Sequence, residues 1–120
     1  MSLIMKSIIL SICMLFSATT LSFSHSVVTN SSPESGARLR VAPKHLEVSF
    51  SKPTRVVKAS LTHNENDPVK LTLSTKEPTK MIRFSPAPKD AGNYVIEWRA
   101  LSEDGHVLKG SLEFSIGEPK

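Results

Sequence analysis

Short alternating apolar runs, separated by proline, glycine, asparagine and aspartate, are the feature that most restricts the fold of this chain. In His45–Phe50 the side chains of Leu46, Val48 and Phe50 share one side of an extended segment. The alternation returns at Val57, Ala59 and Leu61, at Leu71 and Leu73, at Ile82 and Phe84, at Tyr94, Ile96 and Trp98, and at Leu112, Phe114 and Ile116. With a first strand at Val27-Val28, this spacing predicts an all-β, immunoglobulin-like Greek-key β-sandwich of about seven strands.

The segment before the largest aromatic strand has the form of a tyrosine corner. In Asp90-Ala91-Gly92-Asn93-Tyr94, the tyrosine stands at the start of a strand, where its hydroxyl can bond back to nearby backbone. Trp98 follows on the same strand, and we expect it to lie in the core rather than to stack on a substrate.

Residues 1–24 have the composition of a secretory signal peptide. Lys6 supplies the positive end, residues 8–16 form the apolar stretch, and Ser22 and Ser24 are the small residues before the expected cut. A transmembrane anchor is the rival interpretation, but a span needs about 20 apolar residues and this run is shorter. The sequence therefore predicts a signal peptide at 1–24, a mature domain at 25–120, and a periplasmic location.

Composition limits what the mature domain can be. Of the 120 residues, removal of 24 leaves 96, which is enough for one small domain. Cys13 is the only cysteine and leaves with the leader, so the domain has no disulfide and no thiolate ligand. Loss of Lys6 lowers the formal charge from +4 to +3, and no basic stripe suggests nucleic-acid binding. We expect a monomer.

Two regions carry residues suited to metal binding. Cleavage after Ser24 makes His25 the first residue, which offers its α-amine and its imidazole together. In Asp104-Gly105-His106 an extended backbone would project Asp104 and His106 to the same side, and Gly105 permits a tight bend. This nitrogen-rich set suits Cu(II). Asp104 is either a ligand or a partner that orients the imidazole, and an ordinary Asp-Gly turn is the alternative without function.

The other two histidines are weaker candidates. His45 begins a strand after Pro43-Lys44, and we expect it to be solvated. His63 lies in the polar loop 62–68, and we expect it to be exposed rather than a ligand.

Five stretches of the mature chain resemble the CopC family of periplasmic copper-binding proteins, over essentially its whole length. They are His25-Ser26, residues 32–37, residues 46–51, residues 91–99, and residues 102–106 with Gly110; the W-R-x-x-S-x-D-G-H-x-x-x-G run is the most specific. The resemblance implies a β-sandwich that binds one Cu(II) through a "histidine brace". His25 would give its amine and imidazole, His106 its imidazole, and Asp104 a weaker axial carboxylate.

Two positions depart from some members of that family. Some relatives have a second, Cu(I) site built from a methionine-rich loop and a histidine, but Met81 is the only methionine here outside the leader. We therefore expect that site to be absent. Some relatives also have a glutamate near Cu(II) where this chain has Lys52, so no ligand is expected there.

The resemblance implies a non-enzymatic copper carrier or buffer in copper homeostasis or resistance. Its partners would be the copper ion and an inner-membrane copper transporter or another periplasmic copper protein. Two alternatives remain open: a copper-dependent oxidative enzyme resembling a monooxygenase, and an immunoglobulin-like structural module without metal. The short chain and its single tyrosine, assigned to the corner, disfavour the enzyme.

Overall fold

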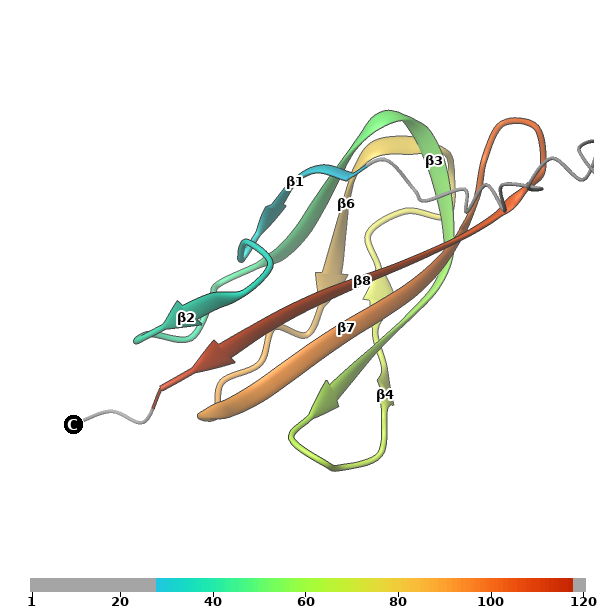
Figure 1. Ribbon diagram of the computed structural model, residues 1–120. Coiled ribbons are helices and arrows are strands. Elements are labelled where there is room, and N and C mark those ends of the chain that lie inside the picture. The colour runs from blue at the N-terminus through green and yellow to red at the C-terminus, as the bar shows by residue number, and fades with distance from the viewer. Residues whose placement is uncertain (1–27, 118–120) are drawn as a thin grey trace, which may run out of the picture.

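The fold is all-β, as the sequence predicted. The computed structural model describes residues 28–117, in which eight strands and no helix occur (Figure 1). Among these residues no helix is therefore long and apolar enough to cross a membrane. The strands are β1 (Val28–Ser32), β2 (Ala37–Leu39), β3 (Leu46–His63), β4 (Val69–Lys70), β5 (Thr72–Leu73), β6 (Thr79–Ser85), β7 (Gly92–Leu101) and β8 (Val107–Ile116).

The strands form two sheets that share β3. The first part of β3 pairs with β1 and β6, and β6 pairs with β5. The last part of β3 pairs with β7 and β4, β7 pairs with β8, and β8 with β2. Figure 1 shows β3 curving from one layer into the other while β7 and β8 run side by side across the front. The β7–β8 hairpin is the longest regular pairing of the fold, from Gly92↔Ile116 to Leu101↔Val107.

The continuity of β3 corrects one detail of the sequence-based pattern, which placed Val57 on the inner face. The pairing register shifts between Ser49 and Thr54 and again between Val56 and Lys58. The second irregularity turns Val57 outward, where it is 49% exposed, and Val56 takes the buried position at 1% exposure. An extra residue in one strand changes which side chains face the core, and simple alternation does not anticipate it.

A second difference is the short strand β2. The turn after β1 was expected, and Gly36 has a positive φ of 83° in it. The chain then pairs with β8 in parallel, with Ala37↔Phe114 and Leu39↔Ile116 as partners. Three residues carry too little alternation for a sequence pattern to detect a strand.

One apolar core lies between the two layers. Its buried members come from β3, β6, β7 and β8, together with Leu71 between β4 and β5. They are Leu46, Val48, Phe50, Val56, Ala59, Leu71, Ile82, Phe84, Tyr94, Ile96, Trp98, Ala100, Leu108, Leu112, Phe114 and Ile116. Trp98 is 4% exposed, so the expected core position is confirmed.

The tyrosine corner is also confirmed. The hydroxyl of Tyr94 donates a hydrogen bond of 2.6 Å to the backbone carbonyl of Asp90. The ring is buried and stacks on Phe114, with ring centroids 5.3 Å apart. This bond fixes the start of β7 against the core.

Replacing Tyr94 by phenylalanine is expected to lower the free energy of unfolding at pH 7 by about 1 kcal/mol, the usual net value of one such hydrogen bond. The apolar ring stays in place, so the loss reports the hydroxyl alone. Urea unfolding of the two proteins measures the difference. An unchanged midpoint would show that the corner does not stabilise this fold.

The free energies of unfolding of the wild-type protein and the Tyr94→Phe variant should converge at alkaline pH. Burial, and then the nearby Asp90 carboxylate, raise the pKa of Tyr94 above its ordinary value of 10.0. Below that value the phenol is neutral in the folded and the unfolded chain, and the bond contributes in full. Above it the unfolded chain loses the proton first, which favours unfolding. The advantage of tyrosine over phenylalanine should therefore shrink as the pH rises beyond 10.

Candidate metal centre

The loop that joins β7 to β8 is a closely hydrogen-bonded turn. The backbone N–H of Ser102 donates to the carbonyl of His106 over 3.0 Å, and the N–H of Gly105 donates to the carbonyl of Ser102 over 3.0 Å. Gly105 has a φ of 84°, a left-handed conformation that glycine adopts without steric cost. The predicted bend at Gly105 is confirmed, although the backbone here is a turn rather than an extended segment.

The side chain of Ser102 holds both chemically active residues of this loop. Its Oγ accepts a hydrogen bond from the backbone N–H of His106 over 3.1 Å and donates to Oδ1 of Asp104. The other carboxylate oxygen, Oδ2, lies 2.9 Å from Nδ1 of His106. A serine two residues before the aspartate therefore organises the pair, a role that the sequence pattern did not indicate.

Among the residues that the structure describes, Nε2 of His106 has no partner. With Nδ1 carrying its proton toward Asp104, Nε2 keeps a lone pair, and the side chain is 72% exposed. A carboxylate behind an imidazole fixes the tautomer and the direction of the ring, as it does in many metal sites. The geometry thus suits binding of a metal ion by Nε2.

Asp104 is held as a carboxylate. The hydrogen bond from Ser102 is the largest cause that lowers its pKa below the ordinary value of 3.8, and the N–H and charge of His106 lower it further. The lowered pKa favours the charged form of this carboxylate.

The loop stands beside the bend of β3. Ser102, Glu103, Asp104 and Leu108 line a pocket of about 340 Å³ together with residues 51–54 of that strand. Lys52 is one of them, so a cation shares the pocket with the Asp104 carboxylate. The expectation that this position supplies no metal ligand stays a prediction.

The structure brings together two of the three candidate ligands. Asp104 and His106 are in contact, whereas His25 lies outside the described residues. Within residues 28–117, no group of three histidine, cysteine, aspartate or glutamate side chains is arranged to hold a metal ion. What these residues offer is a two-residue half-site, one imidazole nitrogen with an anionic partner.

The remaining histidines lie in different surroundings. His45 is exposed, as predicted. The prediction that His63 is exposed is wrong: its ring is half-buried and stacks on Tyr94 with centroids 4.5 Å apart and planes 5° apart. Its Nε2 lies 2.9 Å from the carbonyl of Ala91. The reason is that β3 continues to His63 and pairs this residue with Tyr94 instead of ending before the polar loop.

The sulfur of Met81 lies on β6, in a side chain that is 46% exposed. The expectation of no methionine-rich Cu(I) site stays a prediction.

Comparison with known proteins gives one family. A model described as the CopC domain matches residues 28–117. The chain is 30% identical over 104 residues to the copper transport protein CutJ of Bacillus subtilis (strain 168), which covers 81% of this chain and 19% of CutJ. It is 28% identical over 108 residues to copper resistance protein C of Pseudomonas syringae pv. tomato, covering 82% of this chain and 85% of that protein. The chain thus spans only about a fifth of CutJ.

Solved structures agree on the fold. CopC from Methylosinus trichosporium OB3b superposes with a TM-score of 0.62 at 25% identity, over 78% of this chain and 94% of that one. PcoC, a methionine-rich copper resistance protein from Escherichia coli, gives a TM-score of 0.56 at 24% identity over 78% and 99%. The second likeness concerns the fold alone.

Proposed function

The chain belongs to the CopC family, and on that premise we propose that it is a periplasmic Cu(II) carrier or buffer in copper homeostasis or resistance. The single observation that carries the proposal is the half-site in the β7–β8 loop. There the carboxylate of Asp104 orients the exposed imidazole of His106, 2.9 Å away. The copper-related names of two relatives support copper as the metal.

In the proposed site His106 binds one Cu(II) through Nε2. His25, as the first residue after removal of a signal peptide at 1–24, adds its α-amine and its imidazole. Three nitrogens in a tetragonal arrangement suit Cu(II), which stands at the top of the affinity order of divalent metals. The main role of Asp104 is to orient the imidazole of His106, and a hydrogen bond from the hydroxyl of Ser102 holds the Asp104 carboxylate in place.

The carrier role follows from the chemistry of this ligand set. Neutral nitrogens and an oxygen favour Cu(II), whereas Cu(I) prefers sulfur ligands. Reduction of the bound ion to Cu(I) by one electron from an external reductant would therefore weaken its binding and allow transfer to an inner-membrane copper transporter or another periplasmic copper protein. Cu(II) is cargo here, and we propose that the protein is a monomer and not an enzyme.

The decisive test combines N-terminal mass spectrometry of the secreted protein with Cu(II) titration. We expect a mature chain that begins at His25 and binds one Cu(II), with several nitrogen ligands in its electron paramagnetic resonance spectrum. Affinity should fall on acidification, because protons compete with Cu(II) for the amine and the imidazole nitrogens. The matched control carries one additional alanine before His25 and should bind copper far more weakly.

Each alternative function has its own outcome in these measurements. Equal affinity of the native and the extended chain would remove the role of the N-terminal amine. Absence of bound copper would leave an immunoglobulin-like module without metal. Peroxide-driven oxidation of a polysaccharide by the copper-loaded protein would favour the oxidative enzyme, and we expect none.

A further inference from the structure

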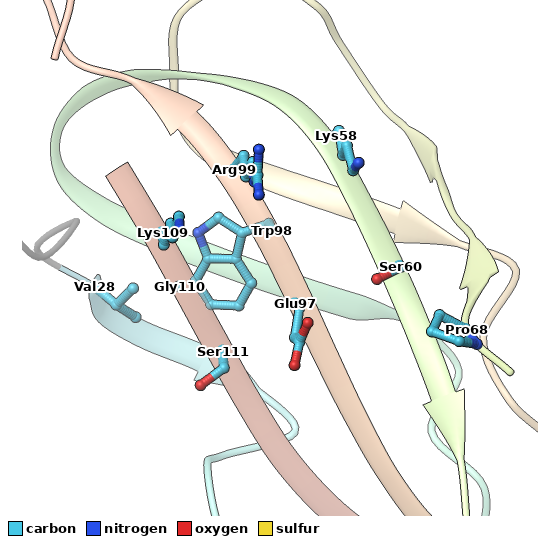
Figure 2. Close-up of a pocket in the computed structure, with 10 residues that line it drawn as sticks. All are labelled: Val28, Lys58, Ser60, Pro68, Glu97, Trp98, Arg99, Lys109, Gly110 and Ser111. Atoms are coloured by element: carbon cyan, nitrogen blue, oxygen red, sulfur yellow. The ribbon is translucent and has the colours of Figure 1, made fainter. Parts of the chain in front are cut away.

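The outer face of the sheet formed by β3, β7 and β8 carries three cations in one row. In the pairing register Lys58 lies opposite Arg99, and Arg99 lies opposite Lys109. All three side chains are exposed. Figure 2 shows them coming from three adjacent strands. We call Lys58, Arg99 and Lys109 the cationic row.

The fold itself gives no account of this row. Like charges on directly opposite residues of neighbouring strands destabilise a sheet. In the part of the chain that the structure describes, none of the three cations makes an ion pair, although Arg55 pairs with Glu77 and Arg83 with Glu47. Glu97 lies two residues before Arg99 on the same face, yet it makes no ion pair with the row. With the Glu97 carboxylate counted against the three cations, this part of the sheet keeps a net positive charge, and none of the three cations is paired with a described carboxylate.

The row also lines a hollow rather than a flat face. The three cations border a pocket of about 850 Å³ together with the carboxylate of Glu97 and the hydroxyl-bearing Ser60 and Ser111. That volume lies within the range of about 300–1,000 Å³ that is typical of ligand pockets. A flat lipid surface would meet only the rim of such a hollow, whereas a protruding chain segment can enter it.

We propose that the cationic row binds an extended, acidic segment of a protein partner. Neighbouring strands lie about 4.8 Å apart, so the row spans about 10 Å. In an extended peptide, side chains on one side repeat about every 6.8 Å, which lets two successive carboxylates of a Glu-x-Glu sequence reach the three cations. Arginine can hold a carboxylate through two parallel hydrogen bonds. This inference concerns a partner surface and does not depend on copper binding.

A labelled decapeptide of alternating glutamate and serine tests the inference, with fluorescence anisotropy as the readout. The row variant Lys58→Gln/Arg99→Gln/Lys109→Gln should bind the peptide at least about tenfold more weakly, since each exposed charge pair contributes modestly. The matched control Lys44→Gln/Lys80→Gln/Lys89→Gln removes the same charge from exposed lysines outside the hollow. It should retain affinity within about twofold. Urea unfolding verifies that both triple variants fold. If the row variant does not fold, the single variant Lys109→Gln replaces it and should bind the peptide about threefold more weakly than the wild-type protein.

Three results would overturn the proposal. The wild-type protein could fail to bind the peptide at all. The row variant and the control could weaken equally, which would assign the effect to net charge alone. Vesicles containing anionic phosphatidylserine could bind through the row more tightly than the peptide does, which would make a lipid surface the occupant.

Discussion

Replacing His106 by alanine is expected to lower the affinity for Cu(II) by a factor of about 100 or more. Loss of a group that supports a metal ligand typically lowers metal affinity 10–100-fold. Loss of the ligand itself should lower the affinity by at least the upper end of that range. His106 is the described residue whose free Nε2 is directed by a carboxylate, through the 2.9 Å contact of Nδ1 with Asp104. Competition titration with a Cu(II) chelator of known affinity measures the change.

The matched control is His45→Ala. His45 is also an exposed histidine, but it lies just before β3 and is not among the residues that line the pocket beside the β7–β8 loop. Its replacement should leave copper affinity within about twofold. Equal losses in both variants would mean that Cu(II) binds imidazoles on the surface without a defined site. Unchanged affinity in His106→Ala would end the copper proposal for this loop.

Asp104→Asn separates the two possible roles of the carboxylate within the same titration. The amide keeps the shape of the side chain but removes the charge that faces Nδ1. A loss of about 10–100-fold with an unchanged number of nitrogen ligands in the electron paramagnetic resonance spectrum indicates orientation of His106. A changed set of oxygen ligands indicates that Asp104 itself binds the metal.

Much of the fold could be predicted because its signals are local. Alternation marks the inner faces of β7 and β8, where Tyr94 to Ala100 and Leu108 to Ile116 keep an uninterrupted register. The corner at Tyr94 depends on five consecutive residues. What the sequence pattern missed is non-local: the irregularity beside Val57 and the parallel pairing of β2 exist only because another strand lies alongside.

The candidate site likewise has local features that the sequence predicts and non-local features that it does not. The bend at Gly105 could be predicted from the freedom of glycine. Asp104 and His106 are in contact as expected, but a turn brings them together rather than the extended backbone on which the prediction rested. The contribution of Ser102 could have been suspected, since serine side chains often bond to backbone two to four residues away. The stacking of His63 on Tyr94 could not be predicted, because it requires that β3 continue far enough to pair His63 with Tyr94 near the start of β7.

The contact between Gly110 and Trp98 makes the second prediction with a large effect. These residues are directly opposite in the pairing of β7 with β8. A Cβ added at Gly110 would lie 2.6 Å from Nε1 of the indole and closer still to its ring carbons Cε2 and Cζ2. Trp98 is buried against Phe84, with ring centroids 6.1 Å apart, so the indole has little freedom to move away. Glycine is therefore required here by a close approach rather than by backbone conformation.

Gly110→Ala is expected to destabilise the fold by about 2 to 3 kcal/mol, because overpacking a well-filled core typically costs 1–3 kcal/mol. The methyl group forces either the indole or the β7–β8 pairing to shift. Urea unfolding followed by tryptophan fluorescence measures the loss directly, since Trp98 is the single tryptophan of the chain. Ser111→Ala, at the next and outward-facing position of β8, is the control and should change stability by less than about 0.5 kcal/mol.

A double-mutant cycle shows whether the indole is the cause. In a Trp98→Leu background the space above Gly110 is free, so Gly110→Ala should become neutral or slightly stabilising, because alanine is entropically easier than glycine to hold in a strand. The coupling between the two positions should then equal most of the 2 to 3 kcal/mol, within the range measured for residues in contact. Far-ultraviolet circular dichroism of the Trp98→Leu pair replaces fluorescence as the probe. An undiminished cost of Gly110→Ala in that background would place the clash in the backbone of the hairpin instead of in the side chain of Trp98.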